Sequence, residues 1–229
     1  MVTVIGRTLP FAAAIAVSPL PVIVAVLILV SDRPRTKSIG YLAGRLAAFV
    51  AVVVVVALLI GGTTTAHHAS RHGPSTAVSI VRIGLGCALI VIAGWLWRGR
   101  GRPGAELPTS KLLRRVDQVT PVRAFGLGVA LVVVDVGSLV PGVMGGLDIG
   151  EARLATGPAI GAGAVFTAIA LATCIVPILA YLIVGSRLDE GLASAKTWLT
   201  ANDRTVAMVM FFVLGTMMVG RGIEALSMG

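Results

Sequence analysis

The chain has 229 residues, of which 56% are hydrophobic and only 13% are charged, and its mean hydropathy is +0.97. A soluble domain of this size is nearer half apolar and one quarter charged, so the composition predicts a polytopic membrane protein without a separate soluble domain. The net charge of +9 would suggest nucleic acid in a soluble protein. Here the basic residues fall in short loops, where they set topology and contact anionic headgroups, so we expect membrane lipids and no nucleic acid as partners.

The first apolar segment, residues 9–30, carries no charge and is long enough as a helix to cross a hydrocarbon core of about 30 Å. Ser18, Pro19 and Pro21 lie near its middle. Proline has no N–H to donate and clashes with the preceding turn, so a break in the helix is predicted there. Such a break is tolerated in lipid where it is buried in protein or lines a wet cavity. We interpret it as one wall of a substrate path, and a proline-kinked packing helix is the alternative.

Five further spans are predicted in chain order, at about residues 39–60, 78–97, 124–147, 155–184 and 206–226. The fourth contains Pro141, and the fifth contains Pro177 and is long enough to tilt. We therefore expect three parts: a three-helix half over residues 1–97, a basic linker over residues 98–123, and a second three-helix half over residues 124–229.

Basic residues gather in three places: the loop between spans one and two, the linker, and the loop between spans five and six. The positive-inside rule places these in the cytoplasm and both termini outside the plasma membrane. The predicted fold is thus all-α, with six transmembrane helices arranged as two inverted three-helix repeats. Span one is interrupted near Ser18 and span four near Ser138 and Pro141. Matching interruptions in inverted halves point to a transporter site near the midplane, so we expect them to face each other across a partly hydrated pocket.

Three ionisable side chains fall inside the predicted spans: Arg45, Arg82 and Asp135. Burying one near the bilayer centre costs about 3 kcal/mol or more, and such groups are functional by default. Asp135 is the deepest, and its carboxyl can carry a proton between the two sides or pair with either arginine. Arg45 and Arg82 lie nearer the span ends, where each is either a headgroup anchor that snorkels or a substrate ligand. Asp148 and Glu151 are expected to be solvated at the outer mouth.

The linker carries a short amphipathic pattern, with three apolar residues on one helical face and three cations off it. It predicts a helix on the cytoplasmic surface that grips anionic headgroups, or else an anchored connector, with the cations Lys111, Arg114 and Arg115. Small residues also recur at the spacing that brings helix backbones together, although with 28 glycines some pairs arise by chance: Gly40 and Gly44, Gly142 and Gly146, Gly157 and Gly161.

Two kinds of site are not expected. His67, His68 and His72 have no acidic or cysteine neighbour, so no metal site is predicted. No nucleotide-binding loop, hydrolase motif or cluster of catalytic residues is visible, so we expect neither a cofactor nor an enzyme.

The residues quoted above also carry a resemblance. The motif Ser18-Pro19-Leu20-Pro21, the loop over residues 31–35, the glycines of residues 40–44 and the stretches over residues 113–121 and 124–128 resemble the actinobacterial GAP/Sap family. These are peptidoglycolipid- and sulfolipid-addressing proteins within the LysE superfamily of small exporters. The family commonly carries Asn-Pro-Lys in span four, where this chain has Asp135-Val136-Gly137. That departure points to a different substrate charge or coupling ion.

Three functions follow. The first is a secondary transporter that exports a cell-envelope glycolipid or lipid-linked precursor: the resemblance implies the lipid class, the pair of broken helices implies transport, and Asp135 would couple it to protons. The wider superfamily implies an exporter of amino acids or other small polar solutes. The third is a scaffold without a transport cycle, which assembles with envelope-biosynthesis partners such as a lipid exporter or glycosyltransferase. A homo-oligomer is compatible with all three.

Overall fold

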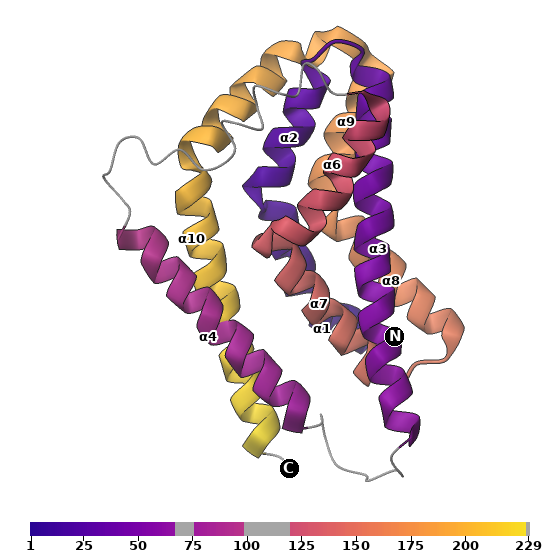
Figure 1. Ribbon diagram of the computed structural model, residues 1–229, viewed down its shortest axis with the longest axis vertical. Coiled ribbons are helices and arrows are strands. Elements are labelled where there is room, and N and C mark those ends of the chain that lie inside the picture. The colour runs from indigo at the N-terminus through magenta and orange to yellow at the C-terminus, as the bar shows by residue number, and fades with distance from the viewer. Residues whose placement is uncertain (67–75, 99–119, 228–229) are drawn as a thin grey trace.

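The computed structural model describes residues 1–66, 76–98 and 120–227, and within these ranges the regular elements are all helices (Figure 1). The predicted linker helix lies outside the described residues, as do Lys111, Arg114, Arg115 and the three histidines. The helices, in chain order, are α1 Val2–Val17, α2 Pro19–Leu29, α3 Pro34–Ala66, α4 Thr76–Arg98, α6 Pro121–Val134, α7 Val136–Glu151, α8 Thr156–Ala170, α9 Ala172–Val184, the 3₁₀ helix η2 Gly185–Leu188, and α10 Asp189–Ser227.

Three helices contain a continuous segment that is long and apolar enough to cross a membrane: Pro34–Gly61, Val78–Arg98 and Arg204–Ser227. Three further pairs pass the same test when each bent pair counts as one span. They are α1 with α2, α6 with α7, and α8 with α9, bent by 49°, 72° and 69°. The described chain thus has three to six candidate spans, which confirms an all-helical, multi-pass membrane protein.

The helix breaks do not always lie at a proline. The first lies at Ser18, as predicted, and Pro19 and Pro21 occupy the first turn of α2, where no helical partner for an N–H is needed. The break in the fourth span was expected near Pro141 but lies at Asp135, whose side chain caps α7; Pro141 is inside α7. The fifth span was expected to tilt as one helix, but it breaks at Leu171.

The helices pack in two groups, one around α3 and α1 and one formed by α4 and α10. α3 packs along α6 and α7, and α1 packs against α7 and α8. α4 packs mainly on α10, and α10 also contacts α2. Figure 1 shows the α4 and lower α10 helices side by side at one flank, with both chain ends in the lower half of the view and the α2–α3 connection at the top. The three broken spans are therefore gathered around α3, and the pair α4 and α10 flanks them.

Glycines allow two of these contacts, those of α3 with α6 and with α7. A Cβ on Gly40 would lie 2.6 Å from the Pro121 carbonyl oxygen, and one on Gly44 would overlap the Phe125 carbonyl. Gly142 and Gly146 face α3 in the same way, so two of the three predicted small-residue pairs lie at helix contacts. The third pair does not, because Gly157 has no heavy atom within 4 Å and Gly161 meets only the Met1 sulfur.

Candidate functional site

The breaks of the first and fourth spans are joined by a hydrogen bond. Ser18, between α1 and α2, donates its hydroxyl to Asp135 Oδ2 over 2.9 Å. Ser138 donates to the same oxygen over 2.6 Å. Both serines are buried, whereas Asp135 is half-buried. The two interruptions therefore face each other as expected, but they touch directly instead of standing apart across a hydrated pocket.

Local sequence explains this contact. Asp135 has extended backbone angles between α6 and α7, and its Oδ1 accepts from the Gly137 amide at 3.1 Å, so it is the N-cap of α7. A Cβ on Gly137 would lie 2.9 Å from Ser18 Oγ and 2.8 Å from the Met210 methyl carbon. A glycine at this position thus allows the first span to come close enough for Ser18 to reach the carboxylate.

Arg45 of α3 extends the polar contact. Its Nη2 donates to Ser138 Oγ over 2.9 Å, so the guanidinium and the Asp135 carboxylate are linked through one hydroxyl. Arg45 is only 1% exposed, so the expectation that it snorkels toward headgroups is wrong. Its Nε and Nη1 have no hydrogen-bond partner among the described residues. A buried cation is tolerated only with a nearby counter-charge, and Asp135 is placed to supply it.

The third helix break, at Leu171, lies near the same region. Thr173, in the first turn of α9, donates to the Ala16 carbonyl at 2.7 Å, near the end of α1. Tyr41 of α3 is fully buried and donates to the Pro21 carbonyl at 2.9 Å. The Cys174 thiol lies against both Tyr41 and Arg45. Backbone carbonyls near the breaks are thus paired with side chains from α3 and α9, as a water-poor environment requires.

Sequence reasoning did not single out Tyr41, Thr173 or Cys174. One signal was available: Tyr41 and Arg45 are four residues apart and therefore share one face of α3. The residues that the structure does bring together from the predicted substrate path are Ser18, Asp135 and Ser138, with Pro19 at the start of α2. Pro21 contributes its carbonyl, and Pro141 is buried within α7 away from the break.

Arg82 belongs to a separate charged cluster. It donates to Asp148 at 2.6 Å and to Glu151 at 2.7 Å, both on α7. Arg221 of α10 lies 3.4 Å from Asp148 and 3.2 Å from the Arg7 carbonyl of α1. The side chains of Arg82 and Asp148 are 3% and 1% exposed, so neither the headgroup-anchor role for Arg82 nor a solvated Asp148 is correct. We call Arg82, Asp148, Glu151 and Arg221 the charged latch.

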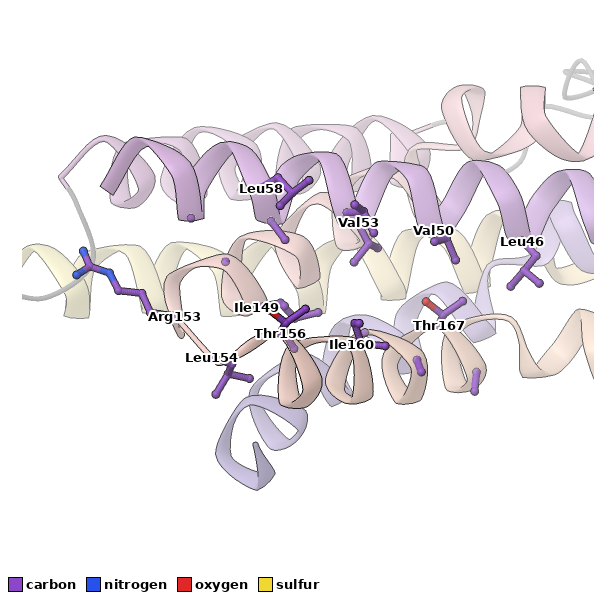
Figure 2. Close-up of a pocket in the computed structure, with 18 of the residues that line it drawn as sticks. Leu46, Val50, Val53, Leu58, Ile149, Arg153, Leu154, Thr156, Ile160 and Thr167 are labelled. Carbon is purple, nitrogen blue, oxygen red and sulfur yellow. The ribbon is translucent and has the colours of Figure 1, made fainter. Parts of the chain in front are cut away.

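A groove of about 940 Å³ lies between α3 and α8 (Figure 2). Its lining is almost entirely aliphatic, and Figure 2 shows Arg153 at one end of it. The described part of the chain contains no group of three histidine, cysteine or acidic side chains that could hold a metal ion.

Comparison with known proteins gives one match. The profile of a protein family described as "Sap, sulfolipid-1-addressing protein" matches residues 8–224. This range includes all three helix breaks and the charged latch. No curated protein and no solved structure matches the chain.

Proposed function

Because the chain belongs to the Sap, sulfolipid-1-addressing protein family, we propose that it is a secondary transporter that moves a cell-envelope glycolipid or lipid-linked precursor across the plasma membrane. The family name supports the lipid class. The contact between two helix breaks supports transport, because interrupted helices that meet within the membrane build the substrate sites of many secondary transporters.

The observation that carries the proposal is the hydrogen bond from Ser18 to Asp135. It joins the N-terminal ends of α2 and α7, and Arg45 lies one hydroxyl away. Helix N-termini carry partial positive charge, so this centre favours a negative group, and Asp135 fills that place in the structure. Protonation of Asp135 would leave Arg45 and both helix ends without a counter-charge. The anionic group of a lipid can then take over that role, which makes Asp135 the coupling carboxyl.

The helix contacts support an inverted repeat. If spans one, two and three are exchanged with spans four, five and six, a contact in one half should have a counterpart in the other. The contact of α3 (span two) with α6 and α7 (span four) then corresponds to the contact of α8 and α9 (span five) with α1 and α2 (span one). The pair α4 and α10 maps onto itself. Two halves related in this way can rock about the central contact and expose it to each side in turn. With the basic loops inside, both termini lie outside the cytoplasm.

The test is export in a deletion strain complemented with variants. Deletion should remove the exported glycolipid from the cell surface. Ser18→Ala and Asp135→Asn should both fail to restore it, while the protein remains in the membrane at the level of the wild type. Thr216→Ala is the matched control, because that exposed hydroxyl bonds only to carbonyls of its own helix; it should restore export fully.

Other outcomes would contradict the proposal or favour one of the two alternative functions. Normal export by Asp135→Asn would remove the coupling role of this carboxyl. Full tolerance of both central substitutions, together with stable co-purification of an envelope-biosynthesis enzyme, would favour the scaffold. Uptake of labelled amino acids by proteoliposomes, in place of a lipid, would favour the exporter of small polar solutes.

A further inference from the structure

The groove between α3 and α8 is separate from the central contact. α3 lines it from Leu46 to Gly61, and α8 lines it with Thr156, Ile160, Gly163 and Thr167 among others. Beneath it, the rings of Phe49 and Phe166 pack with centroids 5.6 Å apart and face glycines of α7. Neither ring is among the described residues that line the groove.

The groove has the length of one membrane leaflet. The α3 residues along it span from position 46 to position 61, which is about 22 Å of helix at 1.5 Å per residue. Half of a bilayer of about 40–45 Å, headgroups included, is about the same length. The inner end lies next to Arg45 in the sequence, at the level of the helix breaks, and the outer end lies at the α7–α8 turn.

The outer end carries positive potential and the rest is apolar. Arg153 is exposed there and is the one charged residue among the described residues of the lining, none of which is acidic. It forms no ion pair with the described residues. The N-terminus of α8 lies at the same end, and its N-cap, Ala155, provides no side-chain hydrogen bond. An uncapped helix start beside an unpaired arginine favours an anion.

We propose that this groove is a specific site for one anionic phospholipid taken from the surrounding leaflet, with its acyl chains along α3 and α8 and its headgroup phosphate at Arg153. A cavity of about 940 Å³ is at the upper end of the size range of small-molecule sites, as two acyl chains require. The proposal does not depend on the transport cycle, because Ser18, Asp135 and Ser138 are not among the residues that line the groove.

The strained backbone at Arg153 supports a binding role for its side chain. Arg153 has a φ of 45°, a conformation that L-residues other than asparagine and aspartate rarely adopt. Asparagine tolerates the same backbone, so Arg153→Asn removes the charge without adding strain.

The experiment is photo-crosslinking of the full chain in nanodiscs, with diazirine-labelled phosphatidylglycerol compared with phosphatidylcholine of the same chains, followed by peptide mapping. In the wild type, phosphatidylglycerol should label the α3 and α8 peptides about fivefold more than phosphatidylcholine, which is the selectivity that one surface arginine supplies. Arg153→Asn should abolish this preference while the groove still accepts both lipids.

A second variant tests the groove itself. A Cβ on Gly163 meets no heavy atom within 4 Å, so Gly163→Phe places a ring in the groove without a backbone clash. It should reduce labelling of both helices severalfold. Gly94→Phe on α4 is the matched control, because Gly94 is equally open and lies outside the groove; labelling should not change. Equal labelling by the two lipids in the wild type, or labelling that Gly163→Phe leaves unaltered, would show that bulk lipid alone fills the groove and would overturn the proposal.

Discussion

At the scale of single residues, the molecule depends on a few charges held away from water. Arg45 and Asp135 compensate each other through Ser138, and neither has a second ion-pair partner among the described residues. Removing one member of such a pair leaves the other as an uncompensated charge, whereas removing both does not. The central contact should therefore show strong coupling between its two charged residues.

A double-mutant cycle tests this coupling. Asp135→Asn and Arg45→Gln should each lower the free energy of unfolding by about 1–3 kcal/mol, because each leaves a charge without its partner. The double variant should lose less than the sum of the two, by about 1 kcal/mol or more. SDS titration of the detergent-solubilised protein measures these values. Strictly additive losses would mean that the two charges do not compensate each other.

Arg153 allows a second test at this scale. Because an L-residue pays about 1 kcal/mol for the left-handed conformation, Arg153→Gly should raise the free energy of unfolding by up to that amount. Gly185, with a φ of 71°, provides the converse: Gly185→Ala should lower it. A lower free energy of unfolding in Arg153→Gly would show that the arginine side chain stabilises the α7–α8 turn. The left-handed backbone at residue 153 would then not be strain that is retained for lipid binding.

At the scale of helices, the contacts rest on close backbone approach more than on large side chains. Gly44 of α3 and Gly128 of α6 face each other's helix so closely that a Cβ on either would overlap backbone atoms. Lipid tails are as apolar as side chains, so helices in a membrane gain little by burying more hydrocarbon and associate instead through such tight packing. The α3–α6 contact also positions Arg45 above Ser138.

Two glycines separate the effect of packing from that of helix propensity. Gly44→Ala should destabilise the protein strongly, because its methyl group would meet the Phe125 carbonyl and α6 would have to move away. Gly126→Ala is the control, since a Cβ there meets nothing within 4 Å; it should stabilise α6 by up to about 1 kcal/mol. Thermal unfolding in detergent compares them, and similar melting temperatures would contradict a close α3–α6 contact.

At the scale of the whole molecule, α4 and α10 form a pair whose helices pack mainly on each other. Its contacts with α1 and α7 are few, and the charged latch supplies the ion pairs that connect them, from Arg82 on α4 and Arg221 on α10 to Asp148 and Glu151 on α7. The latch lies at the end of the molecule that carries the termini, far along α7 from Asp135. It connects the pair α4 and α10 to α7 at this end of the molecule.

Arg82→Gln should open that end. The α4 segment around Arg82 and the last turns of α10 should then exchange backbone hydrogens faster in deuterium, because both ion pairs of Arg82 are lost. Exchange in α3 and α6 should not change. Arg98→Gln, an exposed arginine in the last turn of the same helix, is the control. Unchanged exchange in α4 would show that packing on α10 alone holds this helix in place.

Much of the architecture could be predicted from the residue order alone. Long apolar runs with few charges identify membrane helices, since lipid cannot hydrogen-bond an open backbone, and Ser18-Pro19 identifies a break because proline cannot continue the preceding hydrogen-bond pattern. The family, too, was recognisable from short motifs near Ser18 and Arg33.

Tertiary structure decided which partner each polar group has, and with it the places where helices break. Pro141 and Pro177 look like stronger breakers than Asp135 and Leu171, yet the helices break at the latter two, and at Asp135 the side chain caps the helix that follows. The same holds for the charges: sequence position left Arg45 as either a headgroup anchor or a substrate ligand and placed Asp148 in water, whereas the fold buries both beside a counter-charge. The local sequence determines which groups a residue can bond to, but only the packed chain determines which of those groups lie within hydrogen-bond distance. In a membrane interior this decides the energetic cost of each polar atom, because a buried polar atom without a partner is destabilising.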